Sequence, residues 1–235
     1  MTGRVRTSPE EQRANRRLRQ RGFEWLVKLV SEHLGRQPAI VVDFGCDTGH
    51  LLDLFRAAGT PRTIGIEIAP ATVEQLKREG RHQVYTSFFD ADIADDSVDV
   101  ITDSDTLILY PKNLLELFGA IREKLRPGGL FAIRTPSRNL LCRLWFWWSR
   151  LVHGRRHEAA SMGYFLLNDW RFGLSEKALR LLLERAGLKT IACYRWEHKT
   201  RPMLQTLFEM GAVGLYYLSA KTIDVCPGLI LVARK

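Results

Sequence analysis

The chain has 235 residues, 46% of them apolar, and its 35 Lys and Arg against 26 Asp and Glu give a formal net charge of +9. This length and apolar content suit one buried core with appendages and exclude the need for a second domain. The four cysteines form no C-x-x-C pair and have no zinc-ligand spacing, so we expect neither a disulfide framework nor a metal site.

The first predicted element is a helix over residues 12–34, with an apolar stripe that includes Phe23, Leu26 and Val30. Residues 1–21 hold seven arginines and two glutamates, a net charge of +5, and lack the apolar segment of a secretory signal. We therefore divide the chain into a basic N-terminal helical arm, 1–35, and a domain, 36–235.

Strands and helices alternate in the next hundred residues, which indicates an α/β domain with a mostly parallel sheet. The first strand is a continuous apolar run, as expected for a strand buried on both faces. The predicted strands are Ile40–Phe44, Thr63–Glu67, Gln83–Thr86, Val98–Thr102 and Leu130–Ile133, and the predicted helices are 49–58, Ala71–Arg78 and Asn113–Leu125.

The C-terminal part supplies one helix and two more strands. Ser175 is the predicted N-cap of a helix over Glu176–Ala186, and strands are predicted at Leu188–Tyr194 and Leu229–Ala233. Between these strands, the apolar stretch Met203–Ala220 is too polar for a membrane-spanning helix. We expect it to form a pocket wall or a shallow membrane contact.

The most informative unit is the apolar run VVDFGCDTGHLL at 41–52, followed by a strand that ends in Glu67. Two glycines in a strand-to-helix turn let the backbone approach a ligand, and the helix N-terminus favours anionic groups. A carboxylate at the tip of the second strand can hold the hydroxyls of a ribose. The turn lacks the third glycine of a dinucleotide fingerprint, so NAD is the weaker interpretation.

This turn resembles motif I of the class I S-adenosylmethionine-dependent methyltransferases, with Asp43, Gly45 and Gly49 in place and Asp47 where the middle glycine is usual. The runs SVDVIT at 97–102, LRPGG at 125–129 and LFAIRTP at 130–136 resemble later motifs of the same superfamily, in the same order. The resemblance implies a Rossmann-like, seven-stranded, mostly parallel sheet of order 3-2-1-4-5-7-6, with the last strand antiparallel and helices on both faces.

The resemblance also implies S-adenosylmethionine as the cofactor. Its contacts would come from the turn after the first strand, the tips of the second and fourth strands, and the segment after the third, where Asp90 or the earlier Ser87 would meet the adenine amine. The predicted cofactor residues are Asp43, Gly45, Cys46, Gly49, Glu67, Ile68, Asp90 and Ser104.

A general base is not evident, because the Glu-His pair frequent in the family is replaced by Ile108 and Leu109. Methyl transfer from a sulfonium depends mainly on positioning, so a base is needed only when the acceptor loses a proton. Asp105 is our candidate for that polar role, with a helix cap as the alternative.

Substrate identity should depend on Tyr110 and on an insert at 137–174. There Trp145 and Trp148 share a helical face, and residues 138–156 hold five arginines and no acid. One interpretation is an interfacial helix that also acts as a lid; the other is a helix packed on the core above an apolar pocket.

The endings TPSRN at 135–139 and LLLERAGL at 181–188 resemble the small-molecule branch of the superfamily, with the type 11 and type 23 domains. They imply methylation of a hydrophobic or amphipathic small molecule, quinone-like, lipid or natural product, at oxygen or carbon. Two rivals stay open: an RNA methyltransferase and a non-catalytic cofactor-binding partner.

The two basic segments, 1–21 and 138–156, indicate a negatively charged partner near the mouth of the site. We favour an anionic membrane surface over nucleic acid, because aromatic residues are not interleaved in the N-terminal arm as base stacking requires. We expect a cytoplasmic protein, peripheral to the inner face of the membrane.

Overall fold

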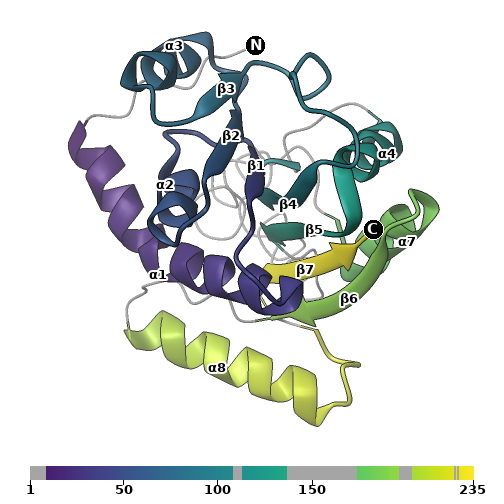
Figure 1. Ribbon diagram of the computed structural model, residues 1–235. Helices are drawn as coiled ribbons and strands as arrows, with labels where there is room; N and C mark the ends of the chain where they lie inside the picture. Colours follow the sequence, from purple (N-terminus) through teal and green to yellow (C-terminus); the bar gives the residue numbers. More distant parts are fainter. Residues whose placement is uncertain (1–8, 108–112, 137–173, 196–202, 225, 227) are drawn as a thin grey trace, which may run out of the picture.

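The computed structural model describes residues 9–107, 113–136, 174–195, 203–224, 226 and 228–235. Seven strands form one sheet in the order β3-β2-β1-β4-β5-β7-β6, which confirms the predicted topology (Figure 1). The strands are β1 (Ile40–Phe44), β2 (Arg62–Ile66), β3 (Gln83–Tyr85), β4 (Val98–Ser104), β5 (Leu125–Pro136), β6 (Lys189–Tyr194) and β7 (Gly228–Arg234). Strand β7 runs opposite to the other six strands of this sheet.

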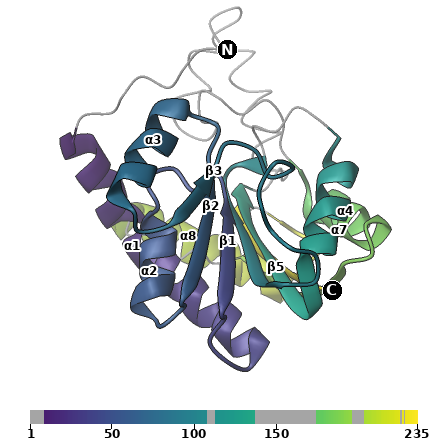
Figure 2. The same cartoon turned by 45° about the horizontal axis from the view of Figure 1, so that its top comes forward.

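Helices cover both faces of the sheet (Figure 2). One face carries α1 (Pro9–Leu34), α2 (His50–Ala57) and α3 (Pro70–Glu79), and the other carries α4 (Leu114–Lys124) and α7 (Glu176–Arg185). Alternate residues of β1 belong to the two apolar clusters, with Val41 on the α1–α3 side and Val42 on the α4–α7 side. Burial of the sheet on both faces explains why the strands read as unbroken apolar runs.

The second half of α1 is part of the core. Phe23, Leu26, Val27 and Val30 are buried against the sheet and α2. The apolar stripe expected in this helix is therefore its packing face. The division of the chain at residue 35 stays a prediction.

Strand β5 is longer than the sequence indicates. The LRPGG run, which separates the predicted helix Asn113–Leu125 from the predicted strand Leu130–Ile133, lies within β5 as a bulge, because Leu125 pairs with Val98 while Leu130 pairs with Val100. Gly128 takes a φ of +79°, which glycine adopts without strain. At its other end β5 reaches Pro136, since β7 continues to pair with it there.

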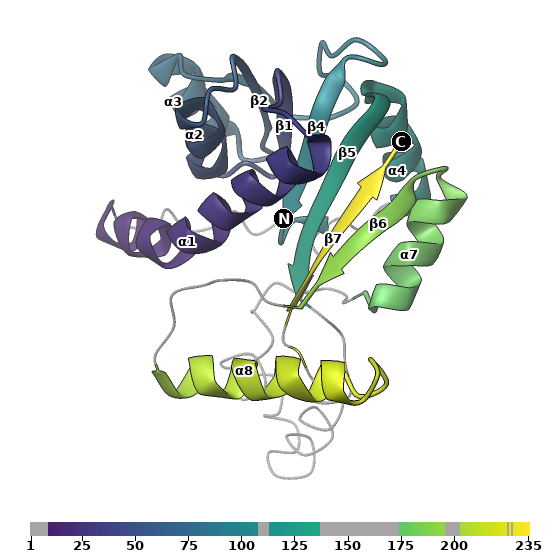
Figure 3. The ribbon, with the colours of Figure 1, turned by 60° about the horizontal axis from the view of Figure 1, so that its bottom comes forward.

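The last helix, α8 (Met203–Leu218), lies beyond the carboxyl ends of β5 and β6 (Figure 3). Its place follows from the chain path, because β7 begins at Gly228, directly beside Pro136 at the end of β5. The carboxyl ends of β1, β2 and β4 meet at this same edge of the sheet, since those strands are parallel to β5.

Candidate functional site

The candidate site lies where the direction of strand addition reverses. From β1 the chain adds β2 and β3 on one side, and β4 and β5 lie on the other. The loops after β1 and β4 therefore separate at the carboxyl edge of the sheet, which is where ligands bind in open α/β sheets. The predicted cofactor residues come from the strand ends and loops at this edge.

The turn after β1 depends on glycine for two different reasons. Gly45 has a φ of +80°, and a Cβ atom there would lie 1.9 Å from Oγ1 of Thr106 in the loop after β4. Gly49 has a φ of +75° and is the N-cap of α2. The backbone amides of Gly45 and Cys46 both donate to the carbonyl of Ile66, at 2.8 and 3.0 Å. The turn is thereby fixed to the end of β2.

Glu67 connects the turn to the segment after β2. Its Oε2 accepts from the amide of Asp47 at 3.0 Å and its Oε1 accepts from the amide of Ala69 at 2.9 Å. Ile68, the next predicted contact, is 80% exposed at the same edge. Cys46 is buried against β2, because a Cβ atom on Gly65 would lie 2.5 Å from its sulfur. The structure thus brings together the residues predicted after β1 and β2.

Asp43 lies buried at the end of β1, beneath this turn. Its Oδ1 accepts from the hydroxyl of Thr102 on β4 at 2.7 Å. Its pKa is raised from 3.8 to about 7, mainly by burial. The hydrogen bond from Thr102 lowers the pKa, whereas the charges of Glu67 and Asp47 raise it. The site therefore contains a carboxyl group whose ionised form a nearby cation would stabilise. Burial also raises the pKa of the Cys46 thiol, which disfavours a reactive thiolate.

The tip of β4 carries two more acidic side chains, of which the sequence singled out only Asp105. Asp103 is fully buried, and its Oδ1 accepts from the amide of Leu107 at 3.1 Å. Burial and the charges of Asp105 and Asp43 raise the pKa of Asp103. Oδ2 of Asp103 and Oδ1 of Asp105 are buried and have no hydrogen-bond partner within the described residues. Buried polar atoms of this kind are candidates for ligand contact.

Arg134, near the end of β5, borders these acids and was not predicted. Its Nη1 donates to Oγ of Ser104 at 2.8 Å and lies 3.5 Å from Oδ2 of Asp105. The guanidinium is buried and lies 5.7 Å from the ring centre of Phe23 on α1. A lone arginine in the apolar run of a predicted strand is the signal that marks it. The predicted residues Ser104 and Asp105 thus belong to a charged cluster between β4 and β5.

The segment after β3 places Asp90 on the surface. Phe88 is buried, with its ring centre 6.2 Å from that of Phe44 at the end of β1, and Ser87 accepts from the amide of Phe89 at 3.2 Å. The segment therefore passes beside the candidate site. A contact from Asp90 or Ser87 to an adenine ring stays a prediction.

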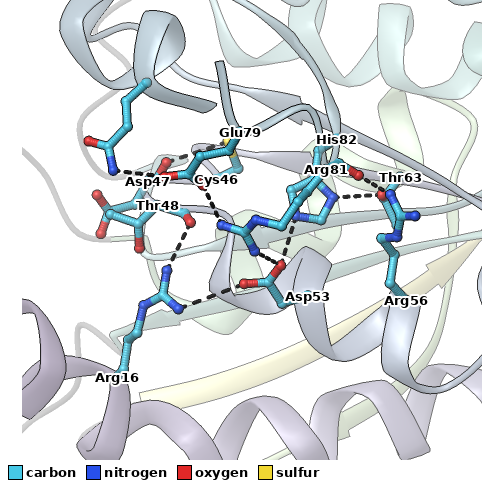
Figure 4. A network of polar contacts seen from close by, with 11 residues as sticks. Arg16, Cys46, Asp47, Thr48, Asp53, Arg56, Thr63, Glu79, Arg81 and His82 are labelled. Atoms are coloured by element: carbon cyan, nitrogen blue, oxygen red, sulfur yellow. Dashed lines mark hydrogen bonds and ion pairs between the residues drawn. The ribbon is translucent and has the colours of Figure 1, made fainter. Parts of the chain in front are cut away.

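Behind the glycine turn lies a polar network that sequence reasoning missed (Figure 4). His82 is buried, and its two ring nitrogens contact Oδ1 of Asp53 on α2, at 3.0 Å, and the hydroxyl of Thr63 on β2, at 2.8 Å. Asp53 also pairs with Arg81 and, at 3.7 Å, with Arg16 of α1, whose guanidinium donates to the carbonyl of Thr48 at 3.1 Å. This network joins α1, the glycine turn, α2, β2 and the segment before β3.

Tyr110, Trp145 and Trp148, with most of the insert at 137–174, lie outside the described residues. The described part of the chain contains no group of three or more His, Cys, Asp or Glu arranged to hold a metal ion.

Comparison with known proteins agrees with this geometry. The model of a family described as "Methyltransferase domain" matches residues 12–192. A malonyl-[acyl-carrier protein] O-methyltransferase of Methylococcus capsulatus is 33% identical over 131 residues, which cover 53% of this chain and 47% of that protein. The chain thus spans about half the length of this relative.

Solved structures share the fold. A SAM-dependent methyltransferase from Archaeoglobus fulgidus superposes with a TM-score of 0.61 at 15% identity, over 91% of this chain and 94% of that one. The geranyl diphosphate C-methyltransferase of Streptomyces coelicolor, solved in complex with geranyl diphosphate and S-adenosyl-L-homocysteine, superposes with a TM-score of 0.59 at 14% identity. The match covers 89% of this chain and 76% of that one. At these identities the similarity is one of fold.

Proposed function

This chain belongs to the methyltransferase-domain family, and from that premise we propose that it transfers a methyl group from S-adenosylmethionine to a hydrophobic or amphipathic small molecule, at oxygen or carbon. The observation that carries the proposal is the joining of Glu67 to the glycine turn through the amide of Asp47. This contact holds the carboxylate of Glu67 beside a backbone turn at the carboxyl edge of the sheet, a position that supports the proposed contact with ribose hydroxyls.

The residues present fit this cofactor. Glu67 keeps acceptor capacity for ribose hydroxyls, since each carboxylate oxygen has two lone pairs and now accepts one backbone bond. S-adenosylmethionine carries a positively charged sulfonium, and acids lie at or beneath the surface of the site: Asp43, Asp47, Glu67, Asp103 and Asp105. The unpartnered oxygens of Asp103 and Asp105 add acceptors at the tip of β4, next to Thr106, which lies against Gly45 of the turn.

When bound, the cofactor supplies a methyl group on sulfur that an in-line nucleophile can displace. The contribution of the chain is to hold both reactants in line and to exclude water. Asp105, at the tip of β4, is the candidate that accepts a proton from an acceptor hydroxyl. Nη1 of Arg134 lies 3.5 Å from Oδ2 of Asp105 and forms an ion pair with it.

One relative supports the choice of acceptor class. The Methylococcus protein, 33% identical over 131 residues, is named an O-methyltransferase. The Asn-Pro-Pro-aromatic signature, which is typical of enzymes that methylate exocyclic base amines, does not occur in this chain. Both observations favour oxygen or carbon over nitrogen.

A labelled-methyl assay tests the proposal against its two rivals. Purified protein and S-adenosylmethionine carrying a labelled methyl group are incubated with cell extract, which is then separated into organic-soluble, RNA and protein fractions. We expect label in the organic-soluble fraction and identification of the product by mass spectrometry. The Glu67→Gln variant serves as the control for cofactor-dependent transfer.

The other outcomes overturn the proposal in distinct ways. Label in the RNA fraction, with retention of the protein on RNA that salt weakens, would identify an RNA methyltransferase. Tight binding of S-adenosylmethionine without transfer to any fraction would identify a non-catalytic cofactor-binding protein.

A further inference from the structure

The outward face of α8 is apolar. Leu207 is 54% exposed, Met210 57% and Leu218 89%. Their spacing along the helix places them on one stripe together with Gly211 and Gly214. Leu215 and Tyr217, also exposed, flank this stripe. A surface helix normally keeps its apolar residues on the face toward the core, as α8 does with Ala212 and Tyr216, so a second apolar stripe on its outward face is unusual.

The opposite face of α8 is fixed to the domain by an ion cluster. Tyr216 is buried, and its ring centre lies 4.8 Å from the guanidinium carbon of Arg195. Arg195 itself is buried and pairs with Glu176 of α7 at 2.5 Å and with Asp224 after α8 at 2.9 Å. This cluster joins α7, the end of β6 and the segment after α8. It therefore sets which face of α8 points outward.

We propose that this stripe on α8 is a docking surface for an anionic lipid bilayer, on which the helix lies flat. A continuous apolar strip on one helix, with an aromatic hydroxyl at its flank, is the form that interfacial helices take. The net charge of +9 attracts the protein to anionic headgroups, and the exposed Lys221 lies just beyond the helix end. Among the described residues no helix is long and apolar enough to cross a membrane.

The dimensions of the stripe on α8 favour a bilayer over a second copy of the chain. A helix of 16 residues is about 24 Å long and about 10 Å across, so one face offers roughly 240 Å². A stable dimer buries about 800 Å² on each partner. A bilayer has no such threshold, because each apolar side chain that enters it contributes independently.

The proposed surface lies on the same side of the domain as the candidate site. Helix α8 crosses the carboxyl ends of β5 and β6 in Figure 3, and the glycine turn lies at the carboxyl end of β1 in the same sheet. Docking through α8 would bring this edge of the sheet toward the lipid. The inference does not depend on methyl transfer and is tested by binding alone.

Sedimentation with vesicles tests it. The full chain is mixed with vesicles of phosphatidylcholine and phosphatidylglycerol, and the bound fraction gives a partition coefficient. We expect wild type to bind and the double variant Leu207→Glu/Leu218→Glu to bind at least about tenfold more weakly, since each change removes one inserted apolar side chain and adds a repelled charge. Leu218→Glu alone, at the most exposed position, should give an intermediate loss.

Leu181→Glu is the matched control: Leu181 is 48% exposed but belongs to α7 and not to the stripe, so the change should leave the partition coefficient unchanged. Circular dichroism and thermal melting confirm that each variant is folded. Absence of wild-type binding, or an equal loss in the control, would overturn the proposal. A wild-type dimer that the double variant dissociates would also overturn it, by assigning the stripe to a second copy of the chain.

Discussion

The buried carboxyl group of Asp43 should make the stability of the ligand-free protein fall as the pH rises. Burial raises its pKa from 3.8 to about 7, so between these values the folded state keeps a proton that the unfolded state has released. Each pH unit in this window then lowers the free energy of unfolding by about 1.4 kcal/mol. The destabilisation by Asp43 is zero below the pKa of the unfolded state and constant above about pH 7.

Substitution of Asp43 by Asn removes this dependence. The asparagine side chain keeps the shape, and its oxygen can still accept from the Thr102 hydroxyl, which donates to Asp43 at 2.7 Å. The Asp43→Asn variant should therefore be more stable than wild type at alkaline pH. The difference should shrink by about 3 kcal/mol on going from about pH 8 to about pH 5, because about two units of the window lie in that range.

Urea unfolding followed by circular dichroism, without ligand at both pH values, measures this difference. Asp92→Asn, at an exposed position, controls for the loss of one carboxylate. Because S-adenosylmethionine is cationic, its affinity for wild type should rise as the pH passes 7, and the Asp43→Asn variant should lack this rise. If the free energy of unfolding of Asp43→Asn exceeds that of wild type by the same amount at both pH values, the reasoning is refuted.

Three further substitutions test the site. Gly45→Ala should lower the free energy of unfolding by about 1–3 kcal/mol more than Gly35→Ala. Both glycines have a positive φ, but only Gly45 has a neighbour, Thr106, in the space of the new methyl group. Equal losses of the two variants in urea unfolding would contradict this. Asp105→Asn should lower kcat about a hundredfold, and a kcat within about twofold of wild type would remove Asp105 from the chemistry. His82→Ala should lower the free energy of unfolding by about 2–4 kcal/mol, since a buried ring and its hydrogen bonds are lost. A decrease of less than about 0.5 kcal/mol would show that the network does not hold the turn.

The sheet could be predicted because its signals are local. The first strand, Ile40–Phe44, has the bounds expected from its apolar run, and the Ser175 side chain caps α7 by accepting from the amide of Ala178 at 3.2 Å. The strand order came from the resemblance of several motifs, since periodicity cannot order strands in a sheet. The glycine turn and the position of Glu67 could also be predicted from the sequence, because the backbone conformation and the strand end favour these residue types.

The rest of the site depends on partners far apart in the chain. His82 and Asp53 are separated by 29 residues, and Arg134 and Ser104 by 30, so neither pair leaves a periodic pattern. The exposed face of α8 was unreadable for a related reason. Its sequence is apolar on several sides, and the ion cluster around Arg195, on other elements, decides which side faces solvent.

The central claim is that the turn at Gly45 and the carboxylate of Glu67 together hold S-adenosylmethionine. Titration calorimetry of this ligand into wild type and the Glu67→Gln variant tests it most directly. We predict binding by wild type and an affinity about ten- to a hundredfold lower in the variant, because a charge-assisted hydrogen bond to a ribose hydroxyl is weakened. Equal affinities of the two proteins, or no heat of binding with folded wild type, would contradict the account.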